Sequence, residues 1–362
     1  MRSTTCLVAA TILAAGWTSA HAEEEEAPDK DSKEPLSFAG RVFVRAVAQS
    51  IESELWEGEL LLDSARLAVN YDWKQKARVK VSIEAAGGVE VKDAFIELAV
   101  AKHLTVQAGR FKLPLSALEQ ASAWTLPTID RGAVADVLGD GVTLTGRRDG
   151  IQATWAKGER GPRVMVALSQ SLSTDGLDPA RAISDGAGVA ATVRAEQDFC
   201  PDIRVGLFAS NREVIDGSTA RRYWAGGADL EVDLAEVKRG LRLWADVIGG
   251  QSHLGAAAAG RERTTFVAAQ AAAGWRLGGK KKNKKYVEPF ALASYFNPSV
   301  DRKGDDIAEV AGGVAGGMWK RWRTQAQVSV VNARGLRPAG LGGALVDVND
   351  AVTITVQLGA AF

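Results

Sequence analysis

Basic side chains recur at regular intervals in the first quarter of the chain. Lys76, Arg78 and Lys80 alternate with the apolar residues Ala77 and Val79. Along one wall of a water-filled passage, a file of such charges would concentrate anions and offer them successive exchange sites. Arginine suits planar bidentate contact with phosphate-like oxygens, whereas lysine acts as a point charge. Solvation or a salt bridge to a neighbouring strand is the alternative for each of them. The candidate anion path is Arg41, Arg45, Arg66, Lys76, Arg78 and Lys80.

These residues lie on segments whose hydrophobic pattern has a period of two. Apolar residues alternate with charged or polar ones over Lys76–Ala85, and the same pattern covers Asp63–Trp73. A helix would scatter the apolar residues around its circumference, whereas a strand places them on one face. Counting such runs predicts about 16 strands, each near the length of a tilted strand that crosses a bilayer. The predicted strands begin at Leu36, Gly58, Gln75, Val89, Lys102, Val142, Gly161, Gly186, Asp202, Arg221, Val237, Arg263, Lys284, Ile307, Trp322 and Asn349.

The connections between these strands alternate in length. Those after even-numbered strands are short, as at Trp73–Lys74 and Ala101–Lys102. Those after odd-numbered strands are mostly longer, and they include residues 112–141, 171–185, 249–262 and 332–348. Short turns on one side and long loops on the other are typical of an outer-membrane barrel, with the short turns in the periplasm.

Aromatic residues gather at two levels of the predicted strands. Such levels are expected where aromatic rings meet the two headgroup layers of a bilayer. At the short-turn end we place Phe38, Tyr71, Trp73, Trp155, Phe199, Trp275, Trp319, Trp322 and Phe362. At the long-loop end we place Trp56, Tyr223, Trp224, Tyr295 and Phe296. The last strand ends on Phe362 and looks like the C-terminal strand that outer-membrane assembly machinery recognises.

A sheet in hydrocarbon must close, because every backbone amide needs a partner and an open sheet leaves two bare edges. With about 16 strands the interior is too wide for side chains to fill and becomes an aqueous channel. We therefore predict an all-β fold, a transmembrane antiparallel β-barrel over residues 36–362. It would contact outer-membrane lipid outside and pass small hydrophilic or anionic solutes inside.

The N-terminus has the features of an export signal. Arg2 provides a positive charge, Cys6–Gly16 is a short apolar stretch, and Ala20–Ala22 fits a signal-peptidase site. We predict a signal peptide over residues 1–22 and hence the outer membrane of a Gram-negative-type bacterium. Residues 23–35 are acidic and nearly free of apolar side chains, which predicts a disordered periplasmic segment.

The composition excludes several classes of protein. The 44 basic and 44 acidic residues leave no basic surplus for a nucleic-acid partner. After signal cleavage only Cys200 remains, which rules out an internal disulfide and a thiolate zinc cluster. No metal site or cofactor motif is evident. The neutral total conceals an acidic tail and a lysine-rich turn at residues 280–285, so any anion preference must come from placement.

The connection over residues 112–141 is the longest and carries many apolar residues. Leu115, Leu118, Trp124 and Leu126 are among them, which is unusual for a mobile surface loop. We predict that it folds into the lumen and narrows the channel; an extracellular lid or a subunit contact is the alternative. The candidate constriction residues are Arg110, Lys112, Asp130 and Arg131.

We expect a set of acidic residues on the wall opposite the basic residues. Asp229, Glu231 and Asp233 share a face of the predicted tenth strand, which lies nearly opposite the second strand in a barrel of about 16 strands. A basic wall facing an acidic wall orients dipolar solutes and admits ions of both signs. We therefore expect a weakly anion-preferring channel rather than a phosphate-specific one.

Four sequence blocks carry a family resemblance: Asp93–Glu97, Ala108–Pro114, Leu126–Arg131 and Gly146–Ile151. They look like the porin O and porin P family of phosphate-selective porins. The resemblance implies a 16-stranded homotrimeric outer-membrane porin whose lumenal arginines and lysines guide anions. Two positions depart from the family pattern: Leu115 replaces a phenylalanine, and Asp130 replaces a glutamate.

Two other classes of function remain as alternatives. An outer-membrane hydrolase needs a nucleophile beside a histidine base. His103 and His253 are the histidines that remain after signal cleavage, and we place them at a short turn and in a long loop. No catalytic dyad is therefore evident, and we predict that the protein is not an enzyme. A closed structural or adhesive barrel is the other alternative.

Overall fold

A computed structural model describes residues 35–51, 55–74, 76–142, 144–158, 161–171, 188–200, 202–216, 219–234, 240–252, 263–278, 285–302, 306–319, 321–333 and 350–362. The predicted signal peptide, nearly all of the acidic segment, His253, most of the lysine-rich turn and most of the remaining long loops lie outside these ranges. Within them, no helix is long and apolar enough to cross a membrane.

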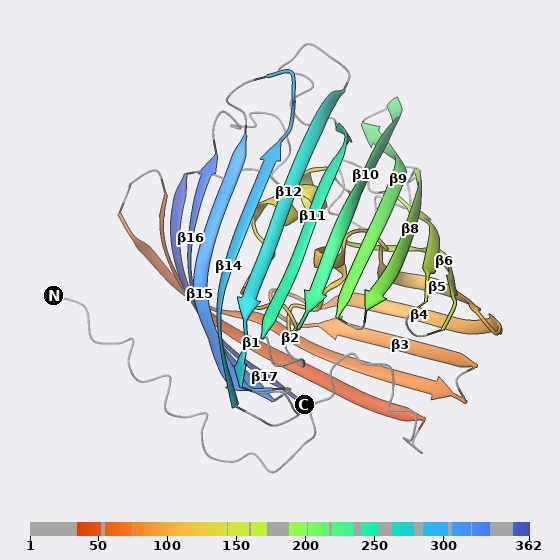
Figure 1. Ribbon diagram of the computed structural model, residues 1–362, viewed down its shortest axis with the longest axis horizontal. Coiled ribbons are helices and arrows are strands. Elements are labelled where there is room, and N and C mark those ends of the chain that lie inside the picture. The colour runs from red at the N-terminus through yellow and green to blue at the C-terminus, as the bar shows by residue number, and fades with distance from the viewer. Residues whose placement is uncertain are drawn as a thin grey trace.

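The strands form one closed antiparallel sheet in which, apart from the short β13, each strand pairs with the strands before and after it in sequence (Figure 1). The first strand also pairs with the last, from Arg41 opposite Ala361 to Ile51 opposite Ala351. The strands are β1 (Leu36–Ile51), β2 (Glu57–Trp73), β3 (Ala77–Glu84), β4 (Glu90–Ala101), β5 (Leu104–Lys112), β6 (Arg147–Ala156), β7 (Arg163–Gln170), β8 (Val189–Cys200), β9 (Ile203–Asp216), β10 (Thr219–Asp233), β11 (Leu241–Ser252), β12 (Thr264–Trp275), β13 (Leu277–Gly278), β14 (Lys285–Asn297), β15 (Ile307–Met318), β16 (Trp322–Ala333) and β17 (Ala351–Ala361).

The short segment β13 continues β12, because both pair with β14. The barrel therefore has 16 strands, as the sequence predicts. Most predicted strand starts agree with the structure to within a few residues. The exception is β6, which begins at Arg147 rather than Val142 because Val142 and Leu144 are buried within the preceding loop.

Alternation along the strands separates the lumen from the outer surface. Buried and exposed positions alternate along the whole of β14, where Glu288 and Ser294 face inward and Val287 faces outward. The outward positions are largely apolar, and Leu168 and Val310 expose more than half of their surface. Polar groups that face the lumen and apolar groups that face out are what a barrel in lipid requires.

The aromatic levels are present with three exceptions. Tyr223 and Phe296 are buried inside the barrel, whereas their neighbours Trp224 and Tyr295 are exposed on the outer surface. Adjacent residues of a strand point to opposite faces, so only one of each pair can reach the headgroups. Trp319 also turns inward and packs edge-on against Tyr286, with ring centroids 5.9 Å apart.

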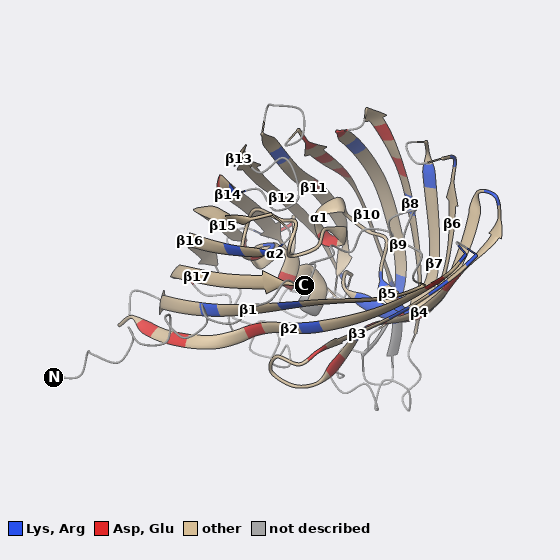
Figure 2. Ribbon diagram, turned by 90° about the horizontal axis from the view of Figure 1, so that it is seen from below, with Lys and Arg blue, Asp and Glu red and all other residues tan. Residues whose placement is uncertain are grey.

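The loop between β5 and β6 folds into the lumen, as predicted (Figure 2). It contains α1 (Ala117–Gln120), α2 (Ala133–Asp136) and a π-helical turn (Val137–Gly141). The Ser116 hydroxyl caps α1 by accepting a hydrogen bond from the Glu119 amide at 3.1 Å. We call residues 113–146 the lumenal loop.

The apolar residues of the lumenal loop pack against the inner wall of the barrel. Leu118 and Leu126 form one cluster with Trp244 and Leu292, and Val137 and its neighbours form another with Phe208, Phe266 and Phe296. These clusters explain why so many apolar residues occur in a loop. The wall on that side is a hydrophobic core for the loop, so the open part of the lumen lies on the other side.

Candidate functional site

A cavity of about 660 Å³ lies between the lumenal loop and the inner wall of β1–β6. The strands contribute alternate inward residues, such as Arg45 of β1 and Lys80 of β3. The loop contributes Gln120, Ser122 and Asp136 among others. The cavity therefore has one rigid side, built on strands, and a second side whose position depends on how the loop is held.

Charged groups dominate the lining, in nearly balanced numbers. Eight cations and seven carboxylates line the cavity. The cations are Arg41, Arg45, Arg66, Lys80, Lys92, Lys112, Arg131 and Arg147. The carboxylates are Asp63, Glu84, Glu90, Asp93, Glu119, Asp130 and Asp136. Seven residues of the predicted site are thus brought together here: Arg41, Arg45, Arg66, Lys80, Lys112, Asp130 and Arg131.

Arg45 joins the wall to the lumenal loop. Its guanidinium donates two hydrogen bonds to the carboxylate of Asp130, at 2.8 and 3.2 Å, and a third to Asp63 at 3.0 Å. Gln357 of β17 also donates to Asp63, at 3.0 Å. Asp130 keeps 44% of its side-chain surface exposed, and Arg45 keeps 17%. This bidentate pair therefore borders the water-filled space while fixing the loop to β1.

The other wall cations are also close to carboxylates. Arg66 lies 3.3 Å from Glu84 across the β2–β3 pairing. Lys80 lies 3.5 Å from Asp93, which also accepts a hydrogen bond from Arg147 at 2.7 Å. Arg66 and Lys80 thus pair with a carboxylate of the adjacent strand, whereas Arg147 of β6 reaches past β5 to Asp93 of β4. Arg45, Arg66 and Lys80 are therefore ion-paired rather than isolated charges, and their field in the lumen is correspondingly reduced.

Three predicted path or constriction residues do not line the cavity. Lys76 is exposed at the turn before β3, and the strand register places Arg78 between Asp72 and Glu97. Arg110 lies on the face of β5 opposite to Phe111, which lines the cavity. Arg110 is 3.7 Å from Asp149 and 3.8 Å from Glu90.

Two further predicted residues contact the lumenal loop itself. Arg41 donates a hydrogen bond to the Ser122 hydroxyl at 3.1 Å. Arg131 donates to the carbonyl of Leu118 at 3.1 Å and to that of Ala121 at 2.5 Å. Arg131 thus ties α1 to the following segment of the same loop while it lines the cavity.

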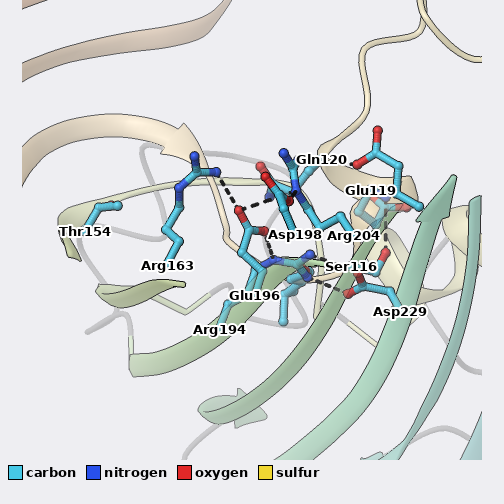
Figure 3. Close-up of polar contacts among 12 residues, drawn as sticks. Ser116, Glu119, Gln120, Thr154, Arg163, Arg194, Glu196, Asp198, Arg204 and Asp229 are labelled. Carbon is cyan, nitrogen blue, oxygen red and sulfur yellow. Dashed lines mark hydrogen bonds and ion pairs between the residues drawn. The ribbon is translucent and has the colours of Figure 1, made fainter. Parts of the chain in front are cut away.

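The three residues of the predicted acidic wall pair with arginines of β8, β9 and β11, and Figure 3 shows the pair between Arg194 and Asp229. Asp229 is buried and accepts two hydrogen bonds from Arg194, one of them at 2.9 Å. Glu231 lies 3.4 Å from Arg204. The remaining acid, Asp233, lies 3.3 Å from Arg242. None of the three acids lines the cavity.

Sequence reasoning missed the buried arginines that contact the lumenal loop. Arg194, Arg212 and Arg323 donate hydrogen bonds to loop carbonyls, and all three are at most 3% exposed. The period-two pattern places each of them on an inward face. That pattern could have identified them as inward residues, but it could not show that they bind backbone rather than water.

The described residues contain no group of three or more His, Cys, Asp or Glu side chains that could hold a metal ion. His103 is exposed at the turn between β4 and β5. The charged lining supports the passage and orientation of charged or dipolar solutes.

Comparison with solved structures places this barrel among known folds. An anion-selective porin from Comamonas acidovorans aligns with a TM-score of 0.61 and 12% identity, covering 90% of this chain and 99% of that one. The chain has the porin fold. Salmonella typhi OmpF in complex with daunomycin aligns with a TM-score of 0.59 and 12% identity, covering 90% of this chain and 97% of that one. OmpT of Vibrio cholerae in its trimer form aligns with a TM-score of 0.53 and 9% identity, covering 90% of this chain and 99% of that one. No family model and no curated protein matches the sequence.

At these low identities the likeness concerns the porin fold. The neighbours include both an anion-selective porin and OmpF, and none of the three compared above is described as phosphate-selective. The resemblance to the phosphate-selective family therefore rests on the four sequence blocks alone.

Proposed function

We propose that this chain is an outer-membrane porin, a water-filled channel for passive diffusion of small hydrophilic solutes with a mild preference for anions. The observation that carries the proposal is the cavity between the lumenal loop and β1–β6, whose lining includes 15 charged side chains. Such a lining holds water, because charged groups are costly to bury without it. The outward-facing apolar surface supports a lipid environment.

The preference for anions follows from placement and from a small surplus. The lining has one more cation than carboxylate, and the strand side carries Arg41, Arg66 and Lys80. Because most of these cations are paired, a phosphate-specific ladder is not favoured. Arginine remains suited to transient bidentate contact with an oxyanion that competes for its present partner.

One observation favours a general, non-selective porin as the second candidate. The lumenal loop places Glu119, Asp130 and Asp136 on the side of the cavity opposite the basic strands. The strand side carries seven cations and four carboxylates, and the loop side carries one cation and three carboxylates. This difference in net charge produces a transverse field, which orients dipolar solutes and admits both ionic signs. In this reading the loop supplies the acidic side, in place of the tenth strand that the sequence suggested.

The cellular setting belongs to the same proposal. The predicted signal peptide over residues 1–22 supports export, and the aromatic strand ending at Phe362 supports recognition by outer-membrane assembly machinery. We propose a homotrimer, as the resemblance to the porin O and porin P family implies. A trimeric form of the OmpT barrel has also been solved.

Planar-bilayer recording of the purified protein tests the function. We expect stepwise ion currents. In a potassium chloride gradient, we expect a zero-current potential that is displaced towards the equilibrium potential of chloride. Bilayers that remain silent while the protein is folded would support a closed structural barrel. Hydrolysis of lipid or peptide without current would support an enzyme. A zero-current potential displaced towards the equilibrium potential of potassium would contradict the preference for anions.

A further inference from the structure

Three buried arginines hold the lumenal loop at its beginning, middle and end. Arg194 of β8 donates to the carbonyl of Leu115, and Arg212 of β9 donates to that of Val142 at 3.1 Å. The third arginine, Arg323, lies on β16. None of the three lines the cavity. A solute in the cavity therefore meets the loop, while these arginines stand behind it.

Arg323 makes the densest contacts of the three. Its guanidinium donates to the carbonyls of Ala123, Trp124 and Leu126, at 2.6, 2.9 and 3.1 Å. It also stacks over the rings of Phe43 and Trp124, with its central carbon 5.1 and 5.2 Å from the ring centroids. A planar group with five donors is suited to holding several carbonyls at once, which a lysine ammonium cannot do in the same geometry.

The next inward residues of β16 continue this attachment along the loop. Gln325 donates to the carbonyl of Pro127 at 2.7 Å, and Gln327 accepts from the amide of Ile129 at 3.0 Å. Inward positions of a strand recur every two residues, so Arg323, Gln325 and Gln327 form a straight row. The loop from residue 124 to residue 129 follows this row, and two of its residues, Leu126 and Ile129, line the cavity.

Arg194 is held differently, by charge. Its guanidinium lies between Asp229 and Glu196, with hydrogen bonds of 2.9 Å to each (Figure 3). The two carboxylates balance the buried charge and fix the direction of the side chain towards Leu115. The first turn after β5, which leads to the cavity-lining residues Glu119 and Gln120, is thereby attached to the wall.

We propose that Arg194, Arg212 and Arg323 are positioning residues, which set the width and steadiness of the channel by fixing the lumenal loop, without facing the permeating solute. This inference rests on the proposed channel function. It assigns these three cations to the loop backbone, so they are removed from the set of charges that select ions. Loss of one of them should alter how the loop moves far more than it alters the barrel.

The test compares variants that differ in loop contact. Arg194→Gln and Arg163→Gln each remove an arginine that binds Glu196, but among the contacts described only Arg194 also binds the loop. We expect larger and noisier single-channel currents for Arg194→Gln and Arg323→Gln, and wild-type currents for Arg163→Gln. Arg323→Lys should lie between Arg323→Gln and the wild type.

A second readout does not depend on conductance. Hydrogen exchange of the loop amides, including the Ile129 amide, should be faster in Arg323→Gln and unchanged in Arg163→Gln. If Arg323→Gln does not fold, Gln325→Ala removes a single loop contact and should show the same effects in weaker form. Unchanged exchange and unchanged current noise in the folded loop variants would overturn the proposal. If the wild-type protein carries no current, but the variants show the expected differences in exchange, the channel function is rejected and the loop attachment is supported.

Discussion

The pair between Arg45 and Asp130 offers a direct test of how the lining controls selectivity. The two side chains are 2.8 Å apart and border the cavity, one on the wall and one on the lumenal loop. Asp130→Asn removes a negative charge and Arg45→Gln removes a positive charge at almost the same place. The lining has one surplus cation, so these variants should raise the surplus to two or abolish it.

The size of the effect can be worked from the geometry. A unit charge about 5 Å from a permeating ion in water interacts with it by about 0.8 kcal/mol, and screening at about 0.1 M salt reduces this to about 0.5 kcal/mol. The change favours one ionic sign and disfavours the other by the same amount, so the free-energy difference between an anion and a cation at this point changes by about 1 kcal/mol. The anion-to-cation permeability ratio therefore changes about fivefold.

The assay is the zero-current potential in a potassium chloride gradient. Asp130→Asn should increase the anion-to-cation permeability ratio, and Arg45→Gln should decrease it. The double variant should return close to the wild-type ratio, because the two charges cancel at a distance. Shifts of the two single variants in the same direction, or a double variant that differs from the wild type by as much as either, would refute the electrostatic reasoning.

Three other outcomes follow from particular contacts. Cys200 is exposed at the short-turn end of β8, so a bulky thiol reagent should modify it in permeabilised cells and leave it unmodified in intact cells; labelling of intact cells would invert the proposed orientation. Trp124→Ala removes a stack on Phe43 with centroids 5.6 Å apart, and should lower the unfolding stability of the loop by about 3 kcal/mol and increase current noise. Gly206→Val places a side chain on the buried ion pair between β8 and β10 and should lower barrel stability by about 1–3 kcal/mol in urea unfolding. Gly312→Val is the matched control, since a Cβ there meets nothing closer than 3.8 Å, and a loss equal to that of Gly206→Val would contradict the packing argument.

The sequence predicts the barrel because the period-two pattern is a local signal. Each strand must present apolar residues outward and polar residues inward, and this requirement holds residue by residue. The predicted start of β6 at Val142 is wrong, because the apolar residues Val142 and Leu144 continue the pattern of a strand although they are buried between the lumenal loop and the wall. Burial of that kind depends on where the chain turns back, which the local pattern does not contain.

The pairing of charges could not be predicted from the sequence. Asp229 of β10 accepts a hydrogen bond from Arg194 of β8, although β9 lies between these two strands. The contact is possible because the β9 residue between them is Gly206. A Cβ at Gly206 would overlap both side chains. Sequence alone shows three acids on one face of a strand, and only the register of three strands shows that an arginine reaches across a glycine to cover one of them.

Two groups of inward-facing arginines in this barrel have different partners. Arg45 and Arg66 pair with carboxylates at the edge of the water-filled space, where an anion can compete for them. Arg212 and Arg323 are buried against carbonyl groups, where an anion would have to displace the lumenal loop to reach them. Counting arginines on inward faces therefore overestimates the charge that a solute meets. The selectivity of the channel should depend on the first group, and the shape of its constriction on the second.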